Sequence, residues 1–152
     1  MRAVDIMKRE VISVGQDESL IDVLTVLLEN NISGVPVVNE KQEIVGILTE
    51  KDLITNRKVW NIPSYIEYIQ SILSIDGKLQ QLKMEPVQKL SAKDIMSSPV
   101  YTVGVGSSIE EIVCIMVNRR INRIPVVDKK RRIVGIIGRS DLLPLLINQL
   151  RR

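Results

Sequence analysis

Apolar residues recur with a helical period in two separate stretches of the chain. In the first stretch, Ser19 precedes the apolar positions and Asp22 follows it by three residues. This spacing is a capping-box pattern, which predicts a helix that starts at Ser19 and ends near Asn30-Asn31. The second stretch begins in the same way, with Ser108 and Glu111. The apolar stripe of the first helix consists of Leu20, Val23, Leu24, Leu27 and Leu28.

Shorter apolar runs have the composition of strands. Val35–Val38 and Ile44–Leu48 are rich in β-branched residues, and they flank the polar turn Asn39–Glu43. This arrangement predicts a β-hairpin. Pro36 is expected at the start of its strand, where the missing N–H does least harm. Val11–Val14 is a further short extended segment that precedes the first helix, and Val100–Val103 is its counterpart before the second.

The whole pattern occurs twice, at a constant shift of 89 residues (92 minus 3). Ile32–Leu53 returns as Ile121–Leu142, and Ala3–Met7 returns as Ala92–Met96, without a gap. A second short helix is predicted from Thr49. Each copy is therefore β-α-β-β-α, an α+β arrangement in which helices cover one face of a small sheet. Two copies are too few for a solenoid, which needs three or more, and they favour one module with an internal pseudo-two-fold axis.

Between the copies lies a connector that is longer than an ordinary loop. Ser64 starts a predicted helix in it and Gly77 ends that helix, whereas a second helix over Lys78–Leu90 would be broken by Pro86. Two interpretations stay open, a helical lid packed on the module or a partner-binding or gating element. The chain thus divides into repeat 1 at 1–55, the connector at 56–90 and repeat 2 at 91–150.

Composition excludes several classes of function. Hydrophobic residues make up 45% of the chain and the net charge is +3, which is typical of a soluble globular protein and too mild to indicate nucleic acid. We expect a cytoplasmic protein, because no apolar run approaches the ~20 residues of a membrane span and the first residues lack a signal-peptide core. The single Cys114 excludes an internal disulfide and is expected to be buried in its helix. Histidine is absent, which argues against a zinc site and against catalysis by histidine.

The junction between the second hairpin strand and the following helix carries candidate chemistry. Thr49 and Asp52 form a capping box by their spacing, so a purely structural role is the first interpretation. The same place also suits a ligand, because a helix N-terminus attracts phosphate and a carboxylate there can accept ribose hydroxyls. In the second copy Gly138 replaces the threonine, whereas Ser140 and Asp141 remain.

Both copies together resemble the CBS domain, named after cystathionine beta-synthase, in its tandem arrangement. The resemblance is carried by Asp5-Ile-Met7 with Asp94-Ile-Met96, by Val35-Pro-Val-Val38 with Ile124-Pro-Val-Val127, and by Ile44–Leu53 with its weaker copy. It covers all of the chain except the connector and the ends. It implies a sensor rather than an enzyme, with AMP, ADP, ATP or S-adenosylmethionine bound as a regulatory ligand in clefts between the halves, and no cofactor.

The resemblance also implies which residues hold the ligand. Asp52 is expected to bind the ribose with help from Thr49, and Asp141 with Ser140 is the weaker counterpart. Arg123 is the first candidate for a phosphate contact, by bidentate hydrogen bonds. Each of these residues has a structural alternative, such as capping, strand packing or a surface position. The remaining candidates are Ser13, Val14, Thr102 and Val103 around the base, with Gly34, Val35, Pro36, Asn122, Ile124 and Pro125.

Two further hypotheses stand beside ligand sensing. The chain could be a ligand-free dimerisation or scaffold module that binds an unknown protein partner. It could also be a nucleic-acid-binding accessory protein that uses Lys129–Arg132, although this charge run is expected to be a solvated hairpin turn. The two long helices are apolar nearly all round, which predicts a homodimer. We expect unequal clefts, with the Asp52 cleft the stronger ribose binder because Thr49 is intact there.

Overall fold

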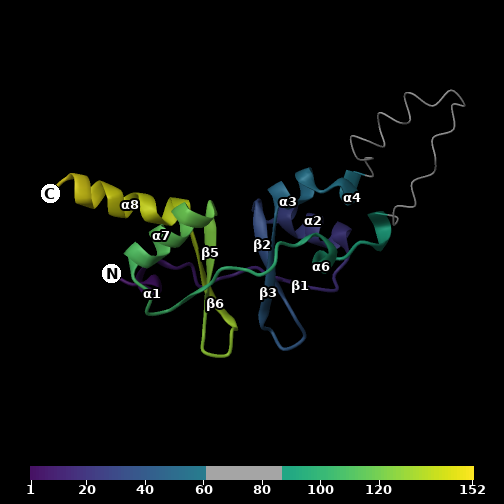
Figure 1. Ribbon diagram of the computed structural model, residues 1–152, viewed down its shortest axis with the longest axis horizontal. Coiled ribbons are helices and arrows are strands. Elements are labelled where there is room, and N and C mark those ends of the chain that lie inside the picture. The colour runs from purple at the N-terminus through teal and green to yellow at the C-terminus, as the bar shows by residue number, and fades with distance from the viewer. Residues whose placement is uncertain (61–86) are drawn as a thin grey trace, which may run out of the picture.

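The computed structural model describes residues 1–60 and 87–152, and it contains two three-stranded sheets flanked by helices (Figure 1). The two sheets lie side by side at the centre of the molecule, and the helices lie on their outer sides. This is the predicted α+β arrangement of two pseudo-symmetric halves. The helix predicted over Ser64–Gly77 and most of the predicted helix at Lys78–Leu90 lie outside the described residues.

The order of elements is the same in both halves. The first half contains α1 (Ala3–Ile6), β1 (Val14–Gly15), α2 (Leu20–Glu29), β2 (Gly34–Val38), β3 (Ile44–Thr49), α3 (Glu50–Thr55) and α4 (Arg57–Trp60). The second half contains a 3-10 turn, η1 (Val87–Lys89), followed by α6 (Ala92–Ile95), β4 (Val103–Gly104), α7 (Ile109–Arg119), β5 (Arg123–Val127), β6 (Ile133–Gly138) and α8 (Arg139–Leu150).

Both long helices begin at the predicted serine caps. Ser19 Oγ accepts a hydrogen bond from the Asp22 N–H at 3.3 Å, and Ser108 Oγ accepts one from the Glu111 N–H at 3.1 Å. Each bond satisfies an N–H that the first helical turn leaves without a partner. The buried residues of the two helices follow the helical period: they are Leu20, Val23 and Leu27 in α2, and Ile112 and Met116 in α7.

The predicted hairpins are confirmed, but Pro36 does not lie at a strand start. In each sheet the first strand is parallel to the second, and the second is antiparallel to the third. Pro36 is the third residue of β2 and pairs with Ile47 of β3. β1 reaches only Val37 and Val38, so β2 has one neighbouring strand at Pro36. A residue without an N–H is tolerated there because no hydrogen bond to β1 is lost.

The first strand of each half is shorter than predicted and shifted along the chain. The sequence predicted Val11–Val14 and its counterpart at 100–103, whereas the strands are Val14–Gly15 and Val103–Gly104. Val11 and Ile12 line a cleft between the halves instead of pairing with a strand. The apolar side chains of Val11 and Ile12 therefore contribute to the cleft and not to a sheet.

Each half begins with a short helix, here called its lead-in helix, that packs against the other half. α1 packs into the core of the second half through Ala3 and Met7, and α6 packs into the core of the first half through Ala92 and Ile95. The segments after these helices pair with the free edges of the third strands. Lys8 exchanges two backbone hydrogen bonds with Ile136 of β6, and Ser97 exchanges two with Ile47 of β3. This exchange ties the two halves together and places both lead-in segments beside the cleft.

The hydrophobic cores are two separate clusters, one in each half. The first consists of Val14, Leu20, Val23, Leu27, Val35, Val37, Leu48, Leu53, Leu90, Ala92 and Ile95. The second consists of Ala3, Met7, Val103, Ile112, Met116, Ile124, Val126 and Ile137. Hairpin contacts join the halves as well, since the Ile44 N–H donates to the Arg131 carbonyl at 3.1 Å.

The prediction that Cys114 is buried is wrong, because its side chain is exposed on α7. The core takes up the side of α7 that carries Ile112 and Met116, so Val113 and Cys114 between them turn outward. The prediction for Lys129–Arg132 is confirmed. This segment forms the exposed turn between β5 and β6, where Asp128 pairs with Arg132 at 2.8 Å.

Candidate functional site

A cleft of about 850 Å³ lies between the two halves of the molecule. It is lined by the lead-in segment around residues 8–12, by the start of β2, by β6, and by the starts of β5 and α8. Both repeats therefore contribute to one site. Six of the residues expected from the sequence line it, namely Gly34, Pro36, Asn122, Arg123, Ser140 and Asp141.

Asp141 is the central carboxylate of this cleft. It lies in the first turn of α8, and its Oδ2 accepts a hydrogen bond from the Gly138 N–H at 2.7 Å. Its Oδ1 pairs with Lys8 Nζ at 3.2 Å. The Asp141 side chain is 14% exposed, whereas the Lys8 side chain is 65% exposed. The carboxylate is thus fixed by the backbone on one side and held on the other by a lysine that is free to move into solvent.

Arg123 reaches across the pseudo-two-fold axis from β5 to the first half. Its Nη2 donates a hydrogen bond to Ser33 Oγ, and its guanidinium lies so close to Gly34 that any side chain at residue 34 would overlap it. Burial lowers the pKa of the Arg123 guanidinium, and the negative charge of Glu50 opposes this shift. An arginine stays protonated under these conditions, so a half-buried positive charge borders the cleft.

The pseudo-equivalent carboxylate, Asp52, is held differently. Its Oδ2 accepts hydrogen bonds from the Thr49 N–H at 2.9 Å and from Thr49 Oγ1 at 3.0 Å. Its Oδ1 accepts one from Ser97 Oγ at 2.8 Å. The capping box predicted for Thr49 and Asp52 is confirmed, since both of its hydrogen bonds are present. Ser97 takes the place that Lys8 has beside Asp141, so a short neutral side chain replaces a long charged one.

The other expected site residues lie outside the 850 Å³ cleft. Val14, Val35, Val103 and Ile124 have buried side chains in the two cores, because they point inward from their strands. Ser13 lines separate hollows near β2 and the hairpin turns. Pro125 is buried and Thr102 is partly exposed, beside β4. For these residues the structure shows packing roles or positions away from the cleft.

Sequence reasoning missed the lead-in segment and Arg139 at the start of α8. Lys8, Glu10, Val11 and Ile12 line the cleft, and so does Arg139. Two signals were present. The apolar pair Val11-Ile12 had no strand partner to explain it, and Lys8 follows the Asp-Ile-Met motif directly. The exchange of lead-in helices between the halves, which brings Lys8 to Asp141, leaves no mark in the local sequence.

Residues 1–60 and 87–152 hold no group of three or more His, Cys, Asp or Glu side chains arranged for a metal ion. Within the same residues, no helix combines the length and the apolar character needed to cross a bilayer.

The sequence and the fold were compared with those of known proteins. The model of the CBS domain matches the chain twice, at residues 3–58 and 92–148. An uncharacterised protein of Methanocaldococcus jannaschii is 33% identical over 94% of this chain and 89% of its own length.

Two solved structures have the same fold. CBSX2 in complex with AMP superposes with a TM-score of 0.70 at 22% identity, covering 99% of this chain and 98% of its own. The CBS domain pair of protein MJ0100, in complex with 5′-methylthioadenosine and S-adenosyl-L-methionine, superposes with a TM-score of 0.69 at 22% identity, covering 98% of both chains. With two matched repeats, the exchanged lead-in helices and this architecture, the chain belongs to the CBS domain family and carries its repeats as a pair.

Proposed function

We propose that this chain is a regulatory module that binds an adenosine-containing ligand in the cleft at Asp141. The observation that carries this proposal is the cleft itself, which is formed by both repeats. Its volume of about 850 Å³ is within the range of roughly 300–1,000 Å³ that small-molecule sites occupy. Two proteins with this fold are named as complexes with AMP and with S-adenosyl-L-methionine and 5′-methylthioadenosine, which supports this class of ligand.

Asp141 is the residue proposed to hold the ribose. A fixed carboxylate with remaining lone pairs accepts hydrogen bonds from two neighbouring hydroxyls, as acidic residues do in dinucleotide sites. The Gly138 N–H keeps the carboxylate in place, and withdrawal of Lys8 would expose Oδ1 to the ligand. Asp52 has three donors from its own chain instead. We therefore reverse the ranking expected from the sequence and propose Asp141 as the stronger site.

The module is proposed to act by a change of shape rather than by chemistry. A ligand in the cleft contacts the lead-in segment, β2, β5 and α8 together, so it stabilises one relative position of the two halves. The output would pass to a homodimer partner or to another protein. We further propose a cytoplasmic location and no catalytic activity.

A second candidate function is a dimerisation or scaffold module without a ligand. It is favoured by exposed apolar side chains on the outer helices, such as Leu28 on α2 and Val117 on α7. Such residues are typical of surfaces that bind another protein.

A thermal-shift screen separates the two candidates. A ligand at 100 times its Kd stabilises the folded state by about 2.7 kcal/mol, which raises Tm by about 5–10 °C for a chain of this size. We expect such a rise with at least one of AMP, ADP, ATP, S-adenosylmethionine and 5′-methylthioadenosine, and none with inorganic phosphate alone. If none of the five shifts Tm, the scaffold function is favoured and the sensor is rejected.

A further inference from the structure

The turn between β5 and β6 carries more positive charge than its pseudo-equivalent in the other half. It spans Asp128–Arg132, here called the basic turn, and four cations minus one carboxylate give it a net charge of +3. The corresponding turn between β2 and β3 spans Asn39–Glu43, here called the acidic turn. One lysine minus two glutamates give it a net charge of −1.

Both turns have the same structure in spite of this difference. The side chain of the first residue, Asp128 in one turn and Asn39 in the other, accepts hydrogen bonds from the N–H groups two and four residues later, at distances between 2.8 and 3.0 Å. Arg131 and Gln42 occupy the same position, with φ angles of 61° and 63°. Because the acidic turn folds in this way without the extra cations, the charge of the basic turn is not needed for folding.

Most of these cations are available to a partner. The side chains of Lys129–Arg131 are exposed, and within residues 1–60 and 87–152 no carboxylate oxygen lies within 4 Å of their charged groups. Arg132 alone is paired, with Asp128 at 2.8 Å. Both turns lie at the lower end of the molecule in Figure 1, and they are in contact, since the Ile44 N–H donates to the Arg131 carbonyl at 3.1 Å. Together they still carry +2, from +3 and −1.

A hollow of about 390 Å³ lies at the base of the basic turn. It shares only Val11 with the Asp141 cleft, so it is a different site. Arg9 adds a further exposed cation to its lining. The adjoining hollow is acidic, with Asp17, Glu18 and Glu40, so an anion is attracted to the side of the basic turn. The other lining residues of the 390 Å³ hollow are Ser13, Gln42, Asp128 and Arg132, which are polar or charged, and Val38, Ile133 and Val134, which are apolar.

We propose that the basic turn and this hollow form a docking surface for an acidic, extended segment of another protein. Carboxylates of that segment pair with Lys129–Arg131 and Arg9, and one of its apolar side chains enters the hollow. This inference goes beyond the proposed function and does not rest on ligand binding in the Asp141 cleft.

The two parts of the surface contribute in different ways. Exposed ion pairs are individually weak, and several of them together attract a partner of opposite charge and orient it. Burial of an apolar side chain adds attraction that salt does not screen. Nucleic acid is the other common polyanion, and it fits less well. No aromatic side chain lines the hollow, so a base finds no ring to stack on.

Fluorescence anisotropy of the full chain with a labelled peptide, Glu-Asp-Leu-Asp-Glu, tests the docking surface. We expect saturable binding that weakens as salt is raised from about 50 mM to about 500 mM, because exposed charges are screened. Serine in place of the peptide's leucine should weaken binding about 3- to 10-fold. A labelled oligothymidylate with the same number of charges should bind more weakly than the peptide. Absence of peptide binding, or equally tight binding of the oligothymidylate, overturns the inference.

A triple variant of the basic turn locates the contact. It keeps the Asp128–Arg132 pair, and it gives residue 131 the amino acid that has the same φ in the acidic turn. Loss of three exposed ion pairs should weaken peptide binding about 3- to 100-fold, with an unchanged melting temperature. The substitutions are Lys129→Gln, Lys130→Gln and Arg131→Gln.

A second triple variant is the matched control. It removes the same number of positive charges at exposed positions outside the docking surface, by Lys51→Gln, Arg151→Gln and Arg152→Gln. Its affinity for the peptide should stay within about twofold of the wild type, since distant exposed charges are screened. An equal loss in both triple variants would show that net charge alone attracts the peptide, and would contradict the inference.

Discussion

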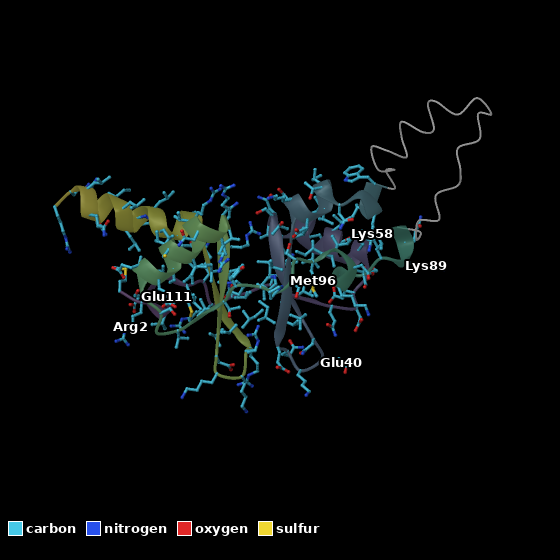
Figure 2. All side chains as sticks on the ribbon, in the orientation of Figure 1. Arg2, Glu40, Lys58, Lys89, Met96 and Glu111 are labelled. Carbon is cyan, nitrogen blue, oxygen red and sulfur yellow. The ribbon has the colours of Figure 1, made fainter. Side chains whose placement is uncertain are left out.

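At the scale of single residues, a methionine of each lead-in segment lies on a glycine of the other half. Met7 Sδ and Cγ lie over Gly135 of β6, and Met96 lies over Gly46 of β3 in the same way. Figure 2 shows Met96 beside β3. A Cβ at either glycine would overlap the methionine. This contact explains why the Asp-Ile-Met and Val-Gly motifs recur together at the same shift.

Gly135→Ala should therefore destabilise the fold by about 1–3 kcal/mol, the usual cost of overpacking a core. The new methyl group would lie 2.8 Å from Met7 Cγ and 3.0 Å from Met7 Cβ, which is not the flexible end of the side chain. Urea unfolding measures the loss. Gly106→Ala is the matched control, because a methyl group there meets no atom within 4 Å. In a Met7→Ala background the cost of Gly135→Ala should shrink, and an equal cost in both backgrounds would refute this contact as its cause.

Residue identity alone was enough to place the capping pairs, since each depends on residues three apart in one chain segment. It was not enough for Arg123 or Lys8. Arg123 was expected to contact phosphate, and the structure shows its present partner to be Ser33, 90 residues away. The Lys8–Asp141 pair depends on the exchanged lead-in helices, which local sequence does not encode.

At the scale of elements, short helices depend on their caps. α6 has only four residues, and the Ser91 N–H donates to Asp94 Oδ2 at 2.8 Å. This hydrogen bond lowers the pKa of Asp94 below its ordinary value, with smaller contributions from the Ser91 hydroxyl and nearby lysines, against a weaker opposing effect of burial. The ionised carboxylate is therefore the form that stabilises the folded state.

Asp94→Asn should cost about 1 kcal/mol or less at pH 7, because the side chain is exposed and the interaction is screened. The folded pKa is the lower one, so the stabilisation is complete above the unfolded pKa of about 3.9 and is lost as pH falls through the folded pKa. Unfolding curves of the variant and wild type at several pH values should converge in acid. Glu40→Gln, on the exposed β2–β3 turn, is the control; a gap that persists in acid would contradict the assignment.

Hydrophobic periodicity predicted the long helices and both hairpins, because these are the elements that bury one regular face. It failed for the first strands. Val11 and Ile12 do not belong to a strand, and they border the cleft instead. The apolar pattern predicted burial in a sheet, whereas Val11 is partly buried and Ile12 is exposed at the cleft. The connector predictions at 61–86 stay predictions.

At the scale of the whole molecule, the outer helices are more apolar than one protomer requires. Leu28 of α2 is 80% exposed, and its pseudo-equivalent Val117 of α7 is 68% exposed. Val26 and Ile115, by contrast, are partly buried against the cores. We predict that the outward-facing residues form a homodimer interface related by two-fold symmetry.

Light scattering should give twice the protomer mass of 17.2 kDa at micromolar concentration. Leu28→Glu and Val117→Glu together should shift the mass to that of one protomer without unfolding it, because both side chains already face solvent. Glu40→Gln serves again as a surface control. A single-protomer mass for the wild type would reject the dimer.

The central claim is that the Asp141 cleft binds the ligand, and calorimetric titration of AMP into the wild type, Asp141→Ala and Asp52→Ala tests it most directly. We predict a single ligand per chain, a loss of about 10- to 100-fold for Asp141→Ala, and a change within about threefold for Asp52→Ala. Thermal melts of the same samples verify that each variant is folded. A larger loss for Asp52→Ala than for Asp141→Ala would contradict the account.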